Sequence, residues 1–112
     1  MSVETRMAIL ESYNAGWRSG DLEVIQEATA PEYQLVTTAA GTLTADRLGP
    51  YLDSLKGGST QDPFMDLEDI ATVNDGPILT AWRRWSIPGF MRGAAMIKII
   101  DEGVISEHVY NG

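Results

Sequence analysis

Residues 77–112, PILTAWRRWSIPGFMRGAAMIKIIDEGVISEHVYNG, contain three stretches that are rich in β-branched and aromatic side chains. This composition predicts strands over Ile78–Ile87, Gly93–Ile100 and Val104–Tyr110. A Pro-Gly pair separates the first two, and an Asp-Glu-Gly run separates the last two. Both connections are typical of hairpin turns. We therefore expect an antiparallel meander at this end of the chain.

In the part of the chain before the meander, the sequence predicts mainly helices. The predicted elements are an amphipathic helix over residues 3–19, a short helix over Leu22–Ala28 with Asp21 as its N-cap, a strand over Tyr33–Ala39, a third helix that Thr44 caps and that ends at Gly57, and a strand over Phe64–Val73. Pro50 predicts a kink, or a restart of the third helix with Pro50 in its first turn. Helices followed by antiparallel strands predict an α+β fold, with the N-terminal helices packed on one face of the sheet.

Length and composition narrow the function. A chain of 112 residues predicts a single domain, residues 1–112, with its own core. A formal charge of −8, with the basic residues scattered, opposes nucleic-acid binding. The sequence has no cysteine, one histidine and no glycine-rich nucleotide motif, so we expect cofactor-free chemistry without a metal. No apolar stretch is long enough to span a membrane and the first residues are unlike a secretory signal, so we expect a cytoplasmic protein.

Strand alternation divides the meander into two faces, and both are apolar over much of their length. One face must pack on the helices. We expect the other to be the odd-numbered face of the first strand, which would expose Leu79, Trp85, Ile87, Ile105 and Val109. Such a patch is larger than monomers usually expose. The sequence therefore predicts a homodimer that packs through the outer face of the sheet.

Two segments resemble a known superfamily. YNAGWRSGDLEVIQEATAPEYQL, residues 13–35, and DEGVISEHVY, residues 101–110, are similar to the nuclear transport factor 2-like superfamily, especially its SnoaL-like polyketide-cyclase branch. The resemblance implies a cystatin-like cone, in which a curved, mostly antiparallel sheet wraps around a helix and leaves an apolar pocket. Members include ketosteroid isomerases, epoxide hydrolases, cyclases, lyases and noncatalytic binders.

The resemblance carries over few catalytic residues. Tyr13 matches the oxyanion-binding tyrosine of the isomerases, but their base falls on Thr37 and their second acid falls near Met96. The arginine and two aspartates of the epoxide hydrolases fall on Trp82, Arg84 and Tyr110. Neither catalytic set is kept, so steroid-type isomerisation and epoxide hydrolysis are disfavoured.

The resemblance also implies that the even-numbered face of the Ile78–Ile87 strand points into the cone. His108 would then transfer protons, while Arg84 with Tyr110 or Tyr13 would stabilise negative charge. The candidate substrate contacts are Trp82, Trp17, Tyr33, Phe90, Met96 and Thr37. Structural alternatives remain, because His108 could be a hydrogen-bonded core residue and Arg84 could pair with Asp66 or Glu68.

These residues favour a cofactor-independent lyase, isomerase or cyclase that acts on an apolar, aromatic or polycyclic small molecule. Two alternatives stay open at this point. One is a noncatalytic ligand-binding or dimerisation module, and the other is an accessory subunit whose cone is filled by its own side chains.

Overall fold

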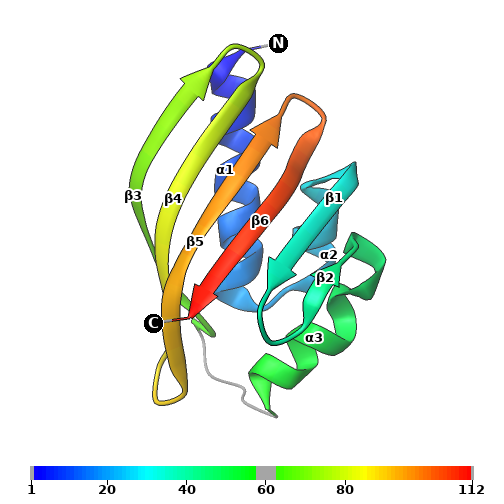
Figure 1. The fold of residues 1–112 in the computed structure, drawn as a ribbon, viewed down its shortest axis with the longest axis vertical. Coiled ribbons are helices and arrows are strands. Elements are labelled where there is room, and N and C mark those ends of the chain that lie inside the picture. Colours follow the sequence, from blue (N-terminus) through cyan, green and yellow to red (C-terminus); the bar gives the residue numbers. More distant parts are fainter. Residues whose placement is uncertain (1, 58–62, 112) are drawn as a thin grey trace.

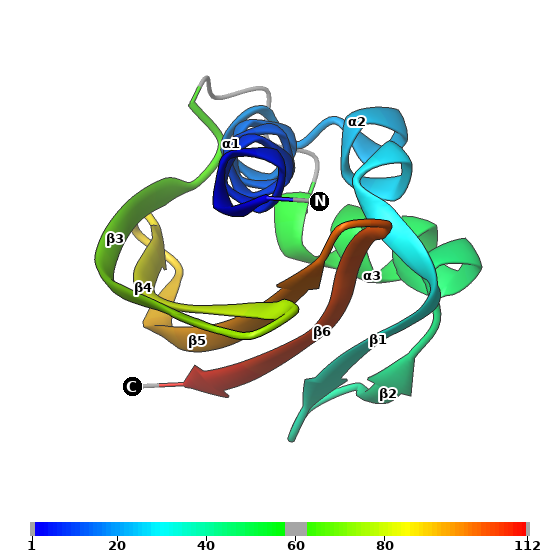
Figure 2. The same ribbon diagram turned by 90° about the horizontal axis from the view of Figure 1, so that it is seen from above.

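Three helices lie on the concave face of a curved six-stranded sheet in the computed structural model, which describes residues 2–57 and 63–111 (Figures 1 and 2). The helices are α1 (Val3–Ser19), α2 (Leu22–Glu27) and α3 (Leu48–Lys56), with a 3₁₀ turn over Ala45–Arg47 before α3. The strands are β1 (Thr29–Thr37), β2 (Gly41–Leu43), β3 (Asp66–Asp75), β4 (Ile78–Ile87), β5 (Met91–Ile100) and β6 (Gly103–Asn111). The predicted α+β class, with N-terminal helices on a mostly antiparallel sheet, is confirmed.

The strand order is β2-β1-β6-β5-β4-β3. All neighbours pair antiparallel except β1 and β6, which run parallel. This pairing joins the strand after α2 to the last strand of the meander. At the other edge β3 curls around α1, as Figure 2 shows, and the sheet forms a trough that holds this helix.

Local sequence explains where α1 and α2 begin and end. Ser2 accepts a hydrogen bond from the amide of Thr5 at the start of α1, and Gly20 ends the helix in the left-handed conformation at φ 68°. Asp21 accepts from the amide of Val24 and so caps α2, as predicted. Leu10 and Trp17 project from α1 into the core.

The boundaries around β1 and α3 differ from the prediction. β1 begins at Thr29, because the amide of Val104 in β6 donates to Ala28 O, 2.8 Å away. The region of Gly41 was predicted to be only a turn, but it starts β2. Thr44 makes no side-chain capping bond to the backbone, whereas Pro50 does lie in the first turn of a restarted helix, as expected.

The sheet face that covers the helices is the opposite of the one expected. In β4 the buried positions are Leu79, Ala81, Arg83, Trp85 and Ile87, while the even-numbered residues point outward. The odd-numbered positions carry one charged side chain among apolar ones, so burying them removes more apolar surface from water. A register shift in the β5–β6 pairing also turns Val104 inward, onto the same side as Glu107.

Among the residues described, no helix combines the length and the hydropathy that a membrane span needs.

Candidate functional site

Four polar side chains from four different elements meet inside the trough. Tyr13 comes from α1, Tyr33 from β1, Arg83 from β4 and Glu107 from β6, and each is at most 3% exposed. The two tyrosine hydroxyls are 2.6 Å apart. Tyr13 donates to Glu107 Oε1, and Arg83 Nη2 lies 2.7 Å from Glu107 Oε2. We call these residues the inner network.

The direction of the hydrogen bonds follows from the ion pair. The carboxylate of Glu107 can only accept, so the Tyr13 proton is committed to it. Tyr33 must therefore donate its own proton to the Tyr13 oxygen. The hydrogen bonds therefore run in a chain from Tyr33 to Tyr13 and from Tyr13 to Glu107. Only Tyr13 donates directly to the carboxylate.

Arg83 is held from several sides. Its Nη1 donates to Asn14 Oδ1, and Asn14 Nδ2 in turn donates to Asp69 Oδ1 at 3.2 Å. The guanidinium carbon also lies 5.5 Å from the centre of the Tyr13 ring, in cation–π range. These contacts fix the guanidinium in place and orient it for Glu107.

The tyrosines of this region are poor acids. Burial raises the pKa of Tyr13 and of Tyr33 well above the usual value, and the charge of Glu107 raises both further. Burial and Glu107 also raise the pKa of Tyr51 to about 12. All three hydroxyls therefore stay protonated near neutral pH, where they can donate hydrogen bonds.

A small cavity adjoins the network. Its volume is about 20 Å³, and its walls are Trp17, Leu35, Tyr51, Leu55, Met65, Arg83, Trp85, Glu107 and Val109. This is room for about one water molecule, whereas small-molecule sites usually enclose about 300–1,000 Å³. We call it the inner pocket. Within residues 2–57 and 63–111, there is no cluster of three or more acidic or histidine side chains that could hold a metal ion.

Comparison with known proteins identifies the fold. No family model and no curated protein matches the sequence. TerC, solved in co-crystals with polyporic acid, is 13% identical, with a TM-score of 0.73 over 96% of this chain and 92% of its own. An NTF2-like protein of unknown function from Cytophaga hutchinsonii is 10% identical, with a TM-score of 0.70 over 100% and 93%. The chain has the nuclear transport factor 2-like (NTF2-like) fold.

A third protein of similar structure comes from Sinorhizobium meliloti and is provisionally assigned as a polyketide cyclase. It is 15% identical, with a TM-score of 0.67 over 92% of this chain and 94% of its own. At such identities the likeness establishes the NTF2-like fold alone. The recognition made from the two sequence segments is thereby confirmed for the fold.

The NTF2-like fold brings only some of the predicted site residues to the inner pocket. Tyr13 and Tyr33 belong to the inner network, and Trp17 lines the pocket. Thr37 faces the core, but its hydroxyl accepts the amide of Ala40 at 2.8 Å and so holds the turn after β1. Phe90 is 60% exposed in the turn between β4 and β5.

The expected inward orientation of the remaining candidates is wrong. Trp82, Arg84, Met96, His108 and Tyr110 all lie on the outer face of the sheet. They cannot share a cavity with Tyr13 and Trp17. The physical reason is the choice of buried face, because the odd-numbered positions of β4 take the core and leave the even-numbered ones to the outside.

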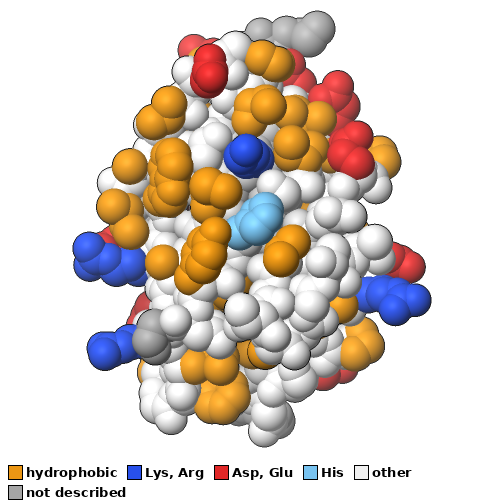
Figure 3. Space-filling view, in the orientation of Figure 1, with side chains coloured by type: hydrophobic (Ala, Val, Ile, Leu, Met, Phe, Trp, Pro, Cys, Tyr) orange, Lys and Arg blue, Asp and Glu red, His pale blue; other side chains and the backbone are white. Residues whose placement is uncertain are grey.

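On this outer face, the single histidine sits among hydrophobic side chains (Figure 3). His108 pairs with Met96 across the sheet on one side and with Val36 on the other, and Met96 pairs with Trp82. The apolar patch expected on the outer face exists, but it is built from these residues. Leu79, Trp85 and Ile87, which were expected there, are buried against the helices.

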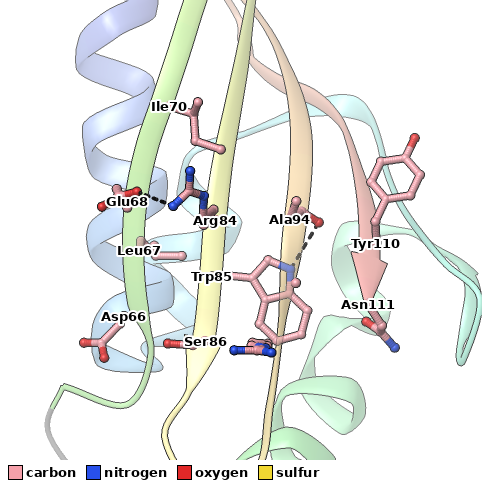
Figure 4. Close-up of a pocket in the computed structure, with 12 residues that line it drawn as sticks. Asp66, Leu67, Glu68, Ile70, Arg84, Trp85, Ser86, Ala94, Tyr110 and Asn111 are labelled. Atoms are coloured by element: carbon pink, nitrogen blue, oxygen red, sulfur yellow. Dashed lines mark hydrogen bonds and ion pairs between the residues drawn. The ribbon is translucent and has the colours of Figure 1, made fainter.

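An open groove of about 790 Å³ crosses the outer face near the ends of β4 and β6 (Figure 4). Arg84 lies there, 3.3 Å from Glu68, and both side chains are more than two-thirds exposed. This is the structural pairing that was left open for Arg84. Trp85 reaches the groove from the inner side, and its Nε1 donates to Ala94 O at 3.2 Å.

Sequence reasoning missed Arg83, Glu107 and Asn14. A signal was present for two of them, because Arg83 and Glu107 are the charged positions on strand faces that are otherwise apolar. A charge on such a face must be paired if the face is buried. Asn14 carried no such signal within α1.

Proposed function

We propose that this protein binds a small, largely apolar molecule in the inner pocket and catalyses a cofactor-independent proton transfer on it, of the isomerase, lyase or cyclase type. The observation that carries this proposal is a buried carboxylate, Glu107, which is bonded to Tyr13 and Arg83 next to an aromatic-walled cavity, with Tyr33 bonded to Tyr13 behind it. Perturbed ionisable groups gathered in a cleft are typical of functional sites.

The inner network suits acid–base chemistry at carbon next to a carbonyl. Each carboxylate oxygen of Glu107 accepts one hydrogen bond, Oε1 from Tyr13 and Oε2 from Arg83. Each oxygen has a second lone pair, which is free to accept a proton. As the C–H bond breaks, its electron pair forms the C=C bond of an enolate, and the carbonyl oxygen takes the negative charge. In a substrate with a C=C next to this carbon the enolate is a dienolate, and the protonated Glu107 returns the proton to the far carbon of that C=C as the C=O re-forms, which moves the double bond and completes an isomerisation. General acid–base catalysis of this kind contributes about 10²- to 10⁴-fold.

Proteins of the same fold support the choice of ligand. TerC was co-crystallised with polyporic acid, an organic small molecule, and the Sinorhizobium meliloti protein is provisionally a polyketide cyclase. Apolar and aromatic residues make up most of the inner pocket here, including Trp17, Leu35 and Val109. An apolar organic ligand fits such walls better than a highly charged one.

The inner pocket must widen before it can hold an organic molecule. A volume of about 20 Å³ takes a water, so side chains at the wall have to move. Met65 has the flexibility to do this, since methionine has several rotatable bonds and no branch. The same small volume favours a second candidate, a noncatalytic protein whose cone is filled by its own side chains.

Proton exchange measures the proposed activity directly. The protein is incubated in deuterium oxide with a panel of aromatic ketones, and proton NMR follows the loss of the C–H signals next to the carbonyl. We expect exchange that Glu107→Gln lowers by at least about 100-fold, in line with the loss of a general base. Tyr13→Phe is a second variant, in case the first does not fold, and circular dichroism checks both.

His108→Ala is the matched control, because His108 lies on the outer face of the sheet. We expect it to keep the exchange rate of the natural protein. Loss of exchange in His108→Ala together with full exchange in Glu107→Gln would overturn the proposal. Ligand binding without exchange in any protein would instead favour the noncatalytic candidate.

We also propose that two copies of the chain pair through the outer face of the sheet. Four large apolar side chains are between 39% and 57% exposed on that face, namely Ile70, Val73, Trp82 and Tyr110. Sheets that pack face to face bury side chains of this type. A second copy would remove this surface from water.

A further inference from the structure

Two buried N–H groups beside the inner pocket have no acceptor among the residues that the structure describes. They are the indole Nε1 of Trp17 and the Nε of Arg83. Trp17 is 2% exposed and Arg83 is 1% exposed, so bulk water does not reach them. Buried polar groups in folded proteins are almost always hydrogen-bonded, and each exception calls for a partner such as a water or a ligand.

Both side chains line the same pocket, whose volume matches a single oxygen-sized group. The third nitrogen-bearing side chain of its wall, Trp85, already donates its indole N–H to Ala94 O. The unpaired donors of this wall are therefore Trp17 and Arg83, and each lacks an acceptor.

The charges at the pocket decide which acceptor fits. Arg83 and Glu107 form a close ion pair, so their charges cancel, and the other wall residues are uncharged. An anionic ligand would meet the carboxylate of Glu107 without a free cation to offset it. A cationic ligand would meet N–H donors and Arg83. A neutral molecule with an acceptor oxygen avoids both costs.

We propose that the inner pocket selects neutral ligands that carry an acceptor oxygen, a carbonyl above all, and that Trp17 Nε1 and Arg83 Nε donate hydrogen bonds to this oxygen. The inference rests on the inner pocket being the ligand site, as proposed above. In the reaction described there, the same two donors hold the oxygen as it becomes negative. Donors aimed at a developing oxyanion are the largest single contribution to many such reactions.

Three probes of similar shape separate the possibilities: acetophenone is a neutral carbonyl compound, ethylbenzene lacks the oxygen, and benzoate carries the charge. Titrations followed by ¹H–¹⁵N NMR of the indole N–H groups report both affinity and contact. We expect acetophenone to shift the Trp17 indole signal and to bind at least about tenfold more tightly than ethylbenzene, the range for pairing a buried donor. Benzoate should bind more weakly than acetophenone.

Trp17→Phe should remove the preference for acetophenone over ethylbenzene. Trp82→Phe is the matched control, since it makes the same change at an indole on the outer face of the sheet, away from the inner pocket, and it should keep the preference. Equal affinity for acetophenone and ethylbenzene, stronger binding of benzoate, or no binding of any probe would overturn the inference.

The failure of this inference can be told apart from the failure of the proposed catalysis. A Trp17-dependent preference for acetophenone without proton exchange supports the ligand class and overturns the enzyme. Proton exchange that depends on Glu107 but shows no preference among the probes supports the enzyme and overturns the ligand class.

Discussion

The buried ion pair between Arg83 and Glu107 makes the sharpest prediction about stability. Glu107→Gln keeps the shape of the side chain but leaves the Arg83 charge without its partner, in a place where Arg83 is 1% exposed. Breaking a buried pair from one side costs about 3–5 kcal/mol of unfolding free energy. The whole free energy of unfolding of a natural domain is about 5–15 kcal/mol, so the variant should be only marginally stable.

Urea unfolding, followed by circular dichroism and tryptophan fluorescence, measures this loss. With a slope of about 1–3 kcal/mol per molar urea, the midpoint should fall by about 1 M or more. Arg83→Met should cost a similar amount. The double variant should lose at least about 2 kcal/mol less than the sum of the two single variants, because neither charge is then left alone.

The neighbouring ion pair is the matched control. Arg84 and Glu68 lie 3.3 Å apart, but their side chains are 69% and 68% exposed. Glu68→Gln should therefore change the unfolding free energy by about 1 kcal/mol or less. A loss of less than about 1 kcal/mol in Glu107→Gln, or additive losses in the double variant, would refute the view that this pair organises the core.

Three further predictions concern alkaline pH, close packing and assembly. The pKa values of Tyr13 and Tyr33 are raised in the folded state, so their contribution to the free energy of unfolding is full below the unfolded pKa of about 10 and is lost as the pH rises above it. Each tyrosine should then lower the free energy of unfolding by about 1.4 kcal/mol per pH unit. Tyr51, with a pKa of about 12, should act in the same direction, and urea midpoints with tyrosinate absorbance test all three. Gly93→Ala should destabilise the protein by about 1–3 kcal/mol or more in the same urea assay, since a Cβ would lie 2.0 Å from Tyr110 O; an unchanged midpoint would contradict the register of β5 and β6. Trp82→Glu should convert the proposed dimer into a monomer in light scattering at micromolar concentration, and a natural protein that is already monomeric there would rule the dimer out.

The local elements of this protein could be predicted from its sequence. The apolar period of residues 3–19 and the Gly20-Asp21 step predicted α1 and its end correctly, because both depend on interactions within a few residues. The turns around Gly89 and Gly103 likewise predicted the β4–β5–β6 meander. The two quoted segments were enough to recognise the fold.

The candidate site was decided by the tertiary structure. Alternation in β4 defines two faces but does not say which one the helices cover, and the wrong choice turned His108 and Arg84 inward. The contact between Tyr13 and Glu107 joins residues 94 positions apart, and it depends on α1 packing against β6. Short-range preferences determine each helix and strand, whereas the site exists only where packing brings distant charges together and forces them to pair.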